Sequence, residues 1–582
     1  MTSTYTYDLP FGATLQPDGR TKFRIWAPSV ESLKLDLDGA EPVAMEPEQN
    51  GWFSTTVTAS PGCSYAFQLP DGMHVPDPAS RRQRGGVHGR SMVVDPTRFN
   101  WQHTAWQGRP WAEAVIYELH PGLCGGFAGV QAMLPGLRDL GVTVVELMPV
   151  AEFPGERNWG YDGTLPFSPD ASLGTPDELK QLIDTAHGMG ICMMLDVVYN
   201  HFGPDGAYIH LYAKDLFTED FSSPWGAGID FRRNEVREYF IQNAIFWLNE
   251  YRFDGLRFDA VHAIQPRSFL DDLARDIHAA VEPGRHVHLV LENEDNEADH
   301  LKKSPADPLF DAQWTDDFHH IMHVLLTGER GSYYVDYAKD TTGLLARSLS
   351  EGFAFQGELS PMRGVPRGTP SAQLPPSSFV VFLQNHDQVG NRATGERINA
   401  ISPPDKLRAA TALVLLAPMI PLLFMGEEWN AKAPFYFFTD HNEELAQLVR
   451  EGRAREFNFE VSDDPDVPNT IPDPNSPKTF DASRPERDDA GMHEFYKHLL
   501  SLRHAHVIPG VEGARSAGCD VLAEGAVAAR WQLGNGTKLT ILCNLSDQPV
   551  RAPTTEGGVL YGVLDGNMLA ADSTVMLLRT AS

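Results

Sequence analysis

Four short segments of the sequence end in residues that could together hydrolyse a glycosidic bond. They read DVVYNH (196–201), GLRFDAVH (255–262), VLEN (290–293) and FLQNHD (382–387). The carboxylates of interest within them are Asp259, Glu292 and Asp387. A retaining glycosidase needs one carboxylate to attack the anomeric carbon and a second, protonated one to give its proton to the leaving oxygen. A third carboxylate can oppose the positive charge that develops on the sugar ring.

The neighbours of these carboxylates favour the same chemistry. Arg257 stands two residues before Asp259, so both side chains lie on one face of an extended strand. We expect this guanidinium to keep Asp259 ionised, and we expect burial beside two other carboxylates to raise the pKa of Glu292. Taken alone, Asp259 could equally be an ordinary surface carboxylate or the residue that caps a helix. The occurrence of all four segments at the ends of successive predicted strands is what favours catalysis.

Alternating apolar strands and helices must position these residues. Strands are predicted at 114–119, 142–150, 191–201, 255–261, 287–293, 378–387 and 420–428, with GFAFQG (352–357) as an eighth. Helices are predicted at 134–141, 175–190, 236–251, 268–281, 406–417 and 494–506. Strands that are apolar throughout are typical of a parallel sheet covered by helices on both faces. The fold class is therefore α/β, with a (β/α)8 TIM-type barrel whose active site lies at the C-terminal ends of the strands.

The rest of the chain divides around this barrel. Residues 1–104 alternate apolar and polar residues in short runs, which predicts an N-terminal β-sandwich. The barrel is predicted over 105–507, and short strands in 508–582 predict a small C-terminal β domain. Prolines and aspartates in 463–489 exclude a long helix there and indicate a loop.

Composition limits the kinds of partner. The 582 residues include 47 Lys and Arg against 78 Asp and Glu, a net charge of −31. Nucleic acids and anionic membranes attract basic surfaces, so neither is expected as a partner. Five widely spaced cysteines, no leader-like start and no apolar stretch of ~18 residues indicate a cytoplasmic protein without a membrane span. We expect a monomer.

The four segments resemble the four sequence regions of the α-amylase superfamily of retaining glycosidases. The resemblance implies that Asp259 is the nucleophile, Glu292 the general acid/base and Asp387 the transition-state stabiliser. It also implies that His201 and His386 contact the sugar in subsite −1, and that Arg257 orients Asp259.

Further stretches resemble one family within this superfamily, the maltooligosyltrehalose trehalohydrolases. They lie at 149–179, 311–320, 325–337, 424–445, 452–457 and 472–480, whereas HPGLCGGF (120–127) is shorter than the family pattern. The resemblance implies hydrolysis of the α-1,4 bond that joins a maltooligosaccharide to a terminal trehalose unit. An α-1,6-active branching or debranching enzyme of the same superfamily is an alternative. A non-catalytic α-glucan-binding protein is an alternative of another class, which the three carboxylates disfavour.

Additional residues are candidates for binding the sugar. Tyr161 in NWGYDG resembles the tyrosine that stacks on the −1 ring, although it would also suit loop packing. The other candidates are Asp162, Trp225, His262, Asp316 and His319, with Trp314, Asp317, His320, Tyr333, Tyr334 and Phe355 as further residues. Those within 311–320 could bind trehalose hydroxyls or order a long loop, and both interpretations stay open.

No metal or cofactor is expected. Asn200 stands where calcium-binding amylases have a ligand. The segment 201–235, however, shows no ring of carboxylates, and a calcium site takes about 6–8 oxygens.

Overall fold

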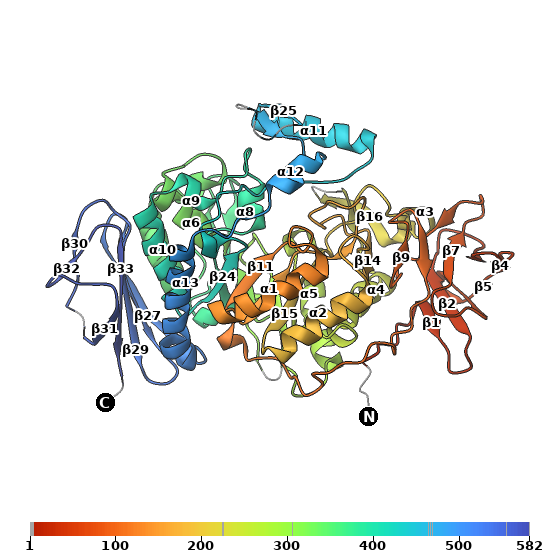
Figure 1. Ribbon diagram of the computed structural model, residues 1–582, viewed down its shortest axis with the longest axis horizontal. Coiled ribbons are helices and arrows are strands. Elements are labelled where there is room, and N and C mark those ends of the chain that lie inside the picture. Colours follow the sequence, from red (N-terminus) through yellow and green to blue (C-terminus); the bar gives the residue numbers. More distant parts are fainter. Residues whose placement is uncertain are drawn as a thin grey trace.

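A closed barrel of eight parallel strands lies between a β-sandwich at one end of the molecule and a β-sheet at the other (Figure 1). The computed structural model describes residues 5–223, 226–304, 307–463, 465, 467, 470–554 and 556–580. Its barrel strands are β11 (Ile116–Leu119), β12 (Val144–Leu147), β15 (Cys192–Val197), β18 (Gly255–Phe258), β19 (His288–Leu291), β20 (Ala312–Trp314), β23 (Phe379–Val381) and β24 (Ile420–Phe424). The barrel closes where Ile116 of β11 pairs with Leu422 of β24. The predicted fold class is confirmed.

One predicted strand is wrong. GFAFQG (352–357) is not a strand, and the sixth position of the barrel is taken by β20 instead. The apolar residues Phe353, Ala354 and Phe355 are buried in a loop, which explains why they resembled a strand. The true strand has only three residues and is followed at once by polar ones, so its sequence carries little strand signal.

Helices surround the barrel. The main ones are α1 (Gly126–Leu140), α2 (Pro176–Gly188), α4 (Asn234–Asn249), α5 (Ser268–Ala280), α6 (Asp316–Thr327), α7 (Thr341–Glu351), α10 (Pro404–Leu416) and α13 (Ala490–Leu502). α2 begins as predicted, because Thr175 and Glu178 form a reciprocal capping box with bonds of 3.2 and 2.7 Å. α1 begins eight residues before the predicted 134, which places its apolar residues Phe127 and Val130 in the core.

The N-terminal sandwich consists of two antiparallel sheets. One contains β1 (Gly12–Leu15), β2 (Thr21–Trp26), β6 (Trp52–Val57) and β5 (Glu46–Pro47). The other contains β4 (Val43–Ala44), β3 (Lys34–Leu37), β7 (Ser64–Gln68), β10 (Arg90–Met92), β9 (Gln83–Arg84) and β8 (His74–Val75). Alternate residues of β2, among them Phe23 and Ile25, are buried, which gives the observed sequence pattern.

A buried ion-pair group joins the segment that follows the sandwich's β8 to the barrel. Nη1 of Arg81 donates to Oε2 of Glu250, just beyond the end of α4, over 2.8 Å. Nζ of Lys180 on α2 donates to the other oxygen of Glu250 over 3.3 Å. Nη2 of Arg81 also donates to the carbonyl of Tyr7 over 2.8 Å. The amino-terminal segment is thus bonded to the end of α4 and, through Glu250, linked to α2.

The C-terminal sheet has the order β27 (Arg515–Ala523), β28 (Ala526–Gln532), β29 (Lys538–Asn544), β33 (Ser573–Arg579) and β31 (Gly558–Tyr561). The apolar segment 521–533 does not form one strand, because the chain reverses at Gly525, where φ is +75°. Thr574 of β33 donates to the carbonyl of Ala409 on α10 over 2.7 Å. The sheet is therefore attached to a barrel helix.

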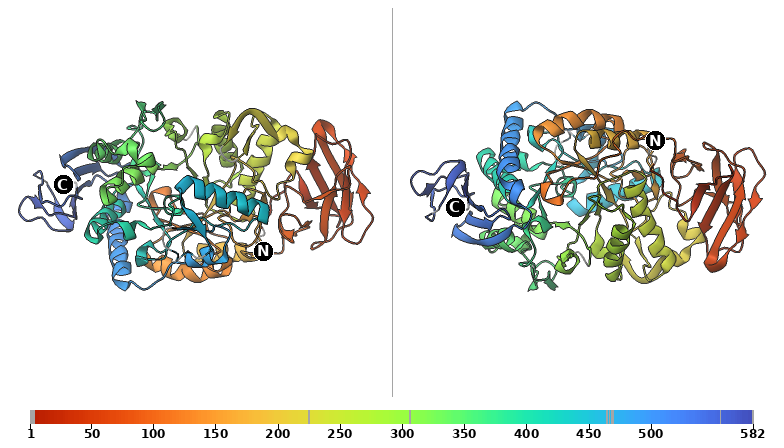
Figure 2. Two further views of the ribbon diagram at one scale, coloured as in Figure 1. Left: turned by 90° about the horizontal axis from the view of Figure 1, so that it is seen from above. Right: turned by 90° about the horizontal axis from the view of Figure 1, so that it is seen from below.

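A polar helical arm lies across the barrel. α11 (Glu443–Phe457) is seen above the barrel in Figure 1 and crosses it in the view from above in Figure 2. It continues through β25 (Glu460–Ser462) and β26 (Thr470–Pro472) to α12 (Pro477–Ala482). In agreement with the prediction, the described part of 463–489 contains no helix longer than six residues.

Shorter elements complete the connections. They are α3 (Ile209–Tyr212), α8 (His386–Gly390), α9 (Ile398–Ile401), β13 (Ala151–Glu152), β14 (Leu165–Pro169), β16 (Phe217–Ser223), β17 (Gly226–Ile229), β21 (Glu358–Leu359), β22 (Pro366–Arg367), β30 (Val550–Arg551) and β32 (Met568–Leu569). Within the described residues, every helix is too short or too polar to cross a lipid bilayer.

Candidate active site

The predicted catalytic carboxylates lie at the C-terminal end of the barrel. Asp259 directly follows β18 and Glu292 directly follows β19. Asp387 is the second residue of α8, in the segment after β23. The carboxyl ends of parallel barrel strands open on one face, so three strands that are separate in sequence deliver their carboxylates to one place.

Arg257 connects these strand ends and is fully buried. Its Nη1 donates to Oδ2 of Asp196 over 2.6 Å and to Oδ1 of Asp259 over 2.9 Å. Its Nη2 donates to Oε2 of Glu292 over 2.7 Å, and its guanidinium lies 4.1 Å from the ring centre of Trp314. A planar guanidinium can reach several carboxylates in fixed directions, which a flexible ammonium cannot. Arg257 therefore sets the positions of Asp259 and Glu292 together.

The second oxygen of Asp259 is held by Asn200. The Nδ2 of Asn200 donates to Oδ2 of Asp259 over 2.7 Å and to its carbonyl over 3.0 Å. Both oxygens of the carboxylate thus have a donor, and its orientation is fixed. The described residues contain no group of three or more His, Cys, Asp or Glu side chains arranged to hold a metal ion.

The protonation of the two carboxyls differs from the expectation. Burial, and next the charge of Glu292, raise the pKa of Asp259 well above its usual range. Burial also acts to raise the pKa of Glu292, but Arg257 and the N–H of Ala260, 2.8 Å away, outweigh it and lower that pKa. The expectation that Glu292 has a raised pKa is therefore wrong for this unliganded arrangement. The physical reason is that Arg257 bonds both carboxyls rather than Asp259 alone.

Asp387 lies beside a stack of aromatic rings. Its Oδ1 is 3.4 Å from Nε2 of His386, whose ring stacks on Tyr161 with centres 5.0 Å apart and planes 15° apart. The hydroxyl of Tyr161 donates to Oδ2 of Asp196 over 2.6 Å. Tyr161 is thus fixed at both its ring and its hydroxyl, within the wall of the site. Burial raises the pKa of Asp387, and the charge of His386 opposes this.

Three further sequence candidates lie near the carboxylates. The Nδ1 of His201 is 2.5 Å from Oδ1 of Asn200, and burial lowers the pKa of His201 to about 4, so its ring is neutral at pH 7. His262 lies close enough to Glu292 for its charge to help lower the pKa of that carboxyl. Asp316, the first residue of α6, has a pKa raised well above its usual range by burial and then by the charge of Glu292.

Two other candidates, Asp162 and His319, are not brought to the carboxylates. Asp162 accepts a 2.6 Å bond from Nδ2 of Asn158, and its charged neighbours are His441 and Asp205. His319 is only 2% exposed, and its Nδ1 bonds the carbonyl of Leu383 over 2.7 Å. This burial favours a role of His319 in packing α6 against the end of β23. Trp225 lies outside the described residues.

The stretch 311–320 combines fully buried and partly buried residues. Asp317 is fully buried and accepts bonds from Tyr337, Asn296 and the N–H of Ala354 over 2.6–2.8 Å. Asp317 therefore orders the loop rather than binding sugar. The ring of His320 packs against that of Tyr333, with centres 4.9 Å apart, and Tyr333 is only partly buried. Tyr334 and Phe355 are buried.

Sequence reasoning missed two glutamates inside the barrel, Glu118 on β11 and Glu146 on β12. They are register partners on adjacent strands, and each is 1% exposed. A signal was present, because each is a charged residue within an otherwise apolar predicted strand. Charged residues are seldom fully buried without a partner, so such a position deserves a search for one.

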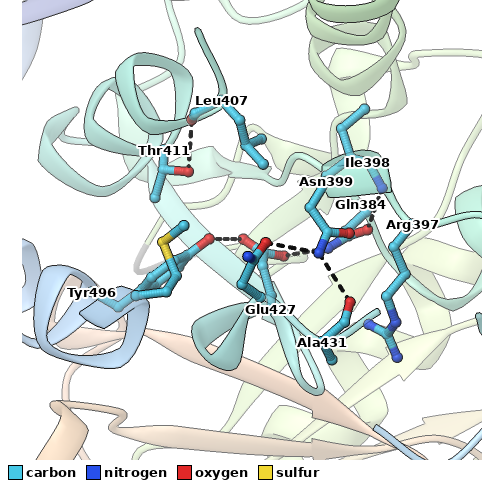
Figure 3. A pocket seen from close by; sticks show the side chains of 11 residues that line it. Gln384, Arg397, Ile398, Asn399, Leu407, Thr411, Glu427, Ala431 and Tyr496 are labelled. Atoms are coloured by element: carbon cyan, nitrogen blue, oxygen red, sulfur yellow. Dashed lines mark hydrogen bonds between the residues drawn. The ribbon is translucent and has the colours of Figure 1, made fainter. Parts of the chain in front are cut away.

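A separate small pocket lies outside the site, between α10, α13 and the end of β24 (Figure 3). Glu427 lies in it and accepts a 2.8 Å bond from the hydroxyl of Tyr496 and a 3.3 Å bond from Nε2 of Gln384. Burial raises the pKa of Glu427 to about 7. The three predicted catalytic carboxylates do not line this pocket.

Comparisons with known proteins find relatives of this chain. A family model described as the catalytic domain of alpha amylase matches residues 93–224, and one described as a domain of unknown function matches residues 514–578. The malto-oligosyltrehalose trehalohydrolase of Deinococcus radiodurans is 40% identical over 509 residues, covering 84% of this chain and 82% of that protein. The enzyme of the same name from Saccharolobus solfataricus is 38% identical over 511 residues, which cover 85% of this chain and 87% of that protein.

A solved structure is similar over the whole length. The 1.4 Å crystal structure of a protein titled a putative alpha amylase from Salmonella typhimurium has a TM-score of 0.93 and 40% identity to this chain. The match covers 99% of this chain and 100% of that one. The similarity thus includes the sandwich and the C-terminal sheet as well as the barrel.

Proposed function

Because this chain belongs to the malto-oligosyltrehalose trehalohydrolase family of the α-amylase superfamily, we propose that it releases trehalose from maltooligosyltrehalose. The bond cleaved is the α-1,4-glucosidic bond next to the terminal trehalose unit. The observation that carries the proposal is the convergence of Asp259 and Glu292 on Arg257, beside Asp387, at the mouth of the barrel. This is the pair of carboxyls that a retaining glycosidase requires.

The proposed reaction proceeds in two displacements. Asp259 attacks the anomeric carbon while Glu292 gives its proton to the leaving oxygen, so trehalose departs and a glucosyl–Asp259 ester forms. Glu292, now ionised, takes a proton from water, and the oxygen of that water attacks the anomeric carbon. The ester bond breaks, Asp259 is regenerated, and the maltooligosaccharide leaves with its original anomeric configuration.

Glu292 must carry a proton before the first step, although the unliganded arrangement favours its ionised form. A glycosidic oxygen bound at Glu292 would take its carboxyl away from Arg257 and from the N–H of Ala260. Burial would then raise the pKa of Glu292, while Arg257 would be left to stabilise ionised Asp259. Substrate binding would in this way move the proton from Asp259 to Glu292.

The remaining residues have proposed roles in holding the sugar. Tyr161 and His386 form a wall on which the −1 ring can rest, and neutral His201 can exchange hydrogen bonds with its hydroxyls. Asp316 and His320 on α6, with Tyr333 packed against His320, could meet the leaving trehalose. Asp387 would oppose the charge on the ring during both steps.

Product analysis on two substrates tests the proposal. Maltotriosyltrehalose and a maltooligosaccharide of equal length are incubated separately with the enzyme, and products are separated by chromatography. The proposal expects rapid release of trehalose from the first and slow cleavage of the second. Equal cleavage of both, or cleavage of a branched glucan only, would support the branching or debranching alternative. Binding without cleavage of any α-glucan would support the non-catalytic alternative.

We also propose that the enzyme acts as a cytoplasmic monomer. All five cysteines are unbridged, which suits a reducing compartment, and the net charge of −31 disfavours nucleic acids and anionic membranes as partners. Light scattering coupled to size exclusion tests the monomer, for which the mass is 64.4 kDa.

A further inference from the structure

Glu118 on β11 binds the imidazole of His386 from across the closing seam of the barrel. Its Oε1 lies 2.5 Å from Nδ1 of His386, and its Oε2 accepts a 3.1 Å bond from the backbone N–H of the same residue. Both oxygens of one buried carboxylate are thus used on one residue of α8. The orientation of the ring relative to β11 is fixed by two bonds.

The other ring nitrogen also faces a carboxylate. Nε2 of His386 is 3.4 Å from Oδ1 of Asp387. An ionised carboxylate only accepts hydrogen bonds, so two such groups around an imidazole favour the ring form that carries a hydrogen on each nitrogen. That form is the positively charged imidazolium. The geometry therefore favours this charge state and holds the ring in a position where both nitrogens face a carboxyl group.

The electrostatic surroundings agree. Burial acts to lower the pKa of His386, but Asp387 and Glu118 together outweigh it and raise the pKa to about 9. Titratable or charged groups face His386 from several barrel strands, from α8 and from the loop that carries Tyr161. They are Glu118 (β11), His120 (after β11), Glu146 (β12), Asp196 (β15), Arg257 (β18), Glu292 (after β19), Asp387 (α8) and Tyr161, which stacks on the ring.

The neighbouring Glu146 differs from Glu118 in its hydrogen bonding. Within the described part of the chain neither of its carboxyl oxygens has a hydrogen-bond partner. Burial, and next the charge of Glu118, raise its pKa well above the usual range. Burial and the charge of Glu118 therefore favour the neutral form of Glu146, although it is the register partner of Glu118 and equally buried.

We propose that Glu118 is a positioning residue that holds His386 as an imidazolium, with its Nε2–H directed at Asp387 and at the substrate hydroxyl bound there. A charged donor at this position keeps Asp387 ionised and binds a sugar hydroxyl more strongly than a neutral imidazole does. The inference deepens the proposed function and rests on it for its effect on catalysis. The charge state of His386 itself does not depend on the substrate.

Glu118→Gln tests the proposal, with Glu146→Gln as the matched control. A glutamine at 118 can accept from the backbone N–H of His386 and donate to Nδ1, so it fits a neutral ring and keeps the shape of the site. Loss of a neighbouring opposite charge lowers the pKa of His386 by about 1–3 units. We expect the fall in kcat/KM on the alkaline side to begin about 1–3 pH units lower than in the wild type. The pH profile of Glu146→Gln should coincide with that of the wild type.

A second measurement reads the charge directly. Nitrogen-15 spectra of histidine side chains distinguish an imidazolium from a neutral ring, and the signal absent from His386→Gln identifies residue 386. At pH 8.5 the wild type should show mainly the imidazolium, and Glu118→Gln, where it folds, mainly the neutral ring. A neutral His386 in the wild type, or a pH profile of folded Glu118→Gln equal to that of the wild type, overturns the proposal. A wild type that releases no trehalose would instead contradict the proposed function and leave the spectroscopic result to decide the charge state.

Discussion

Arg257 donates a 2.7 Å hydrogen bond from Nη2 to Oε2 of Glu292, the carboxyl that has to act as the acid. A guanidinium at this distance stabilises the ionised form of that carboxyl. The unliganded site therefore favours the ionised form of Glu292, whereas catalysis requires its protonated form. We expect substrate binding at Glu292 to weaken this bond, so that protonation of the acid follows substrate binding.

Glu292→Gln removes the proton donor and keeps the size of the side chain. We expect kcat/KM on maltooligosyltrehalose to fall by about 10²–10⁴-fold, as for loss of a general acid. An aryl α-maltooside with an acidic phenol as leaving group needs no proton, so its first step should slow far less. Comparing the bursts of phenol release by the variant and the wild type checks this. Equal losses on both substrates would argue against the acid role.

Arg257→Lys keeps the charge but not the planar fork that joins two carboxyls. The carboxyl that loses its partner gains a higher pKa, so the pH profile of kcat/KM should move toward higher pH. Hydrogen bonds to charged groups contribute about 1.5–3 kcal/mol each, so the free energy of unfolding should fall by a similar amount. Denaturant titration and pH–rate profiles measure the two effects. An unchanged profile would show that Arg257 does not set these pKa values.

Tyr161→Phe tests the hydroxyl separately from the ring. The variant loses the 2.6 Å bond to Asp196 but keeps the stacking on His386. A bond to a charged group is worth about 1.5–3 kcal/mol, so kcat/KM should fall by roughly 10–150-fold at most. Tyr161→Ala should lose more, chiefly through a higher KM, because the sugar platform is removed. If both variants behave alike, the ring has no role in binding.

Glu427→Gln should make stability less dependent on pH. Glu427 has a pKa of about 7 in the folded protein, whereas the pKa of an ordinary glutamate is 4.5. Between these two values Glu427 ionises in the unfolded chain but stays protonated in the folded protein. Keeping Glu427 protonated in the folded protein lowers the free energy of unfolding. This decrease is absent below pH 4.5, grows as the pH rises and is complete above pH 7. One pKa unit equals about 1.4 kcal/mol, so this group should lower the free energy of unfolding of the wild type by roughly 2–3 kcal/mol between pH 5 and pH 8. Glu427→Gln should abolish this decrease.

Denaturant titrations of both proteins at pH 5 and pH 8 measure this difference. Glu428→Gln does not serve as a control, because Glu428 also has a raised pKa. Glu443→Gln on the exposed arm is suitable, and its stability should follow the wild type at both pH values. An equal decrease in the free energy of unfolding from pH 5 to pH 8 in the wild type and in Glu427→Gln would contradict the prediction.

The sequence predicted the barrel well because its strands are apolar throughout and its helices carry caps such as Thr175. It placed Asp259, Glu292 and Asp387 together because strand ends in a parallel barrel open on one face. It misplaced the sixth strand, because three residues of β20 carry less signal than the buried loop around Phe353.

The pairing of Glu118 with His386 could not be read from the sequence, because the residues are 268 positions apart and meet only when the barrel closes. The predicted rise in the pKa of Glu292 was wrong for a related reason. Which carboxyls Arg257 reaches depends on side-chain directions at three strand ends, and no spacing in the sequence gives these directions.

The contact between Arg81 and Glu250 has a consequence for how the gene can change. Loss of Glu250 leaves the buried Arg81 without its carboxylate, at a cost of about 3–5 kcal/mol, whereas loss of Arg81 leaves Glu250 paired with Lys180 alone. Exchange of residues 1–104 between relatives, or their deletion, should therefore destabilise the barrel wherever this ion-pair group is broken. Recombination across this boundary should succeed only where both sides of the ion pair are inherited together, so the module and the barrel are expected to evolve as one cooperative unit.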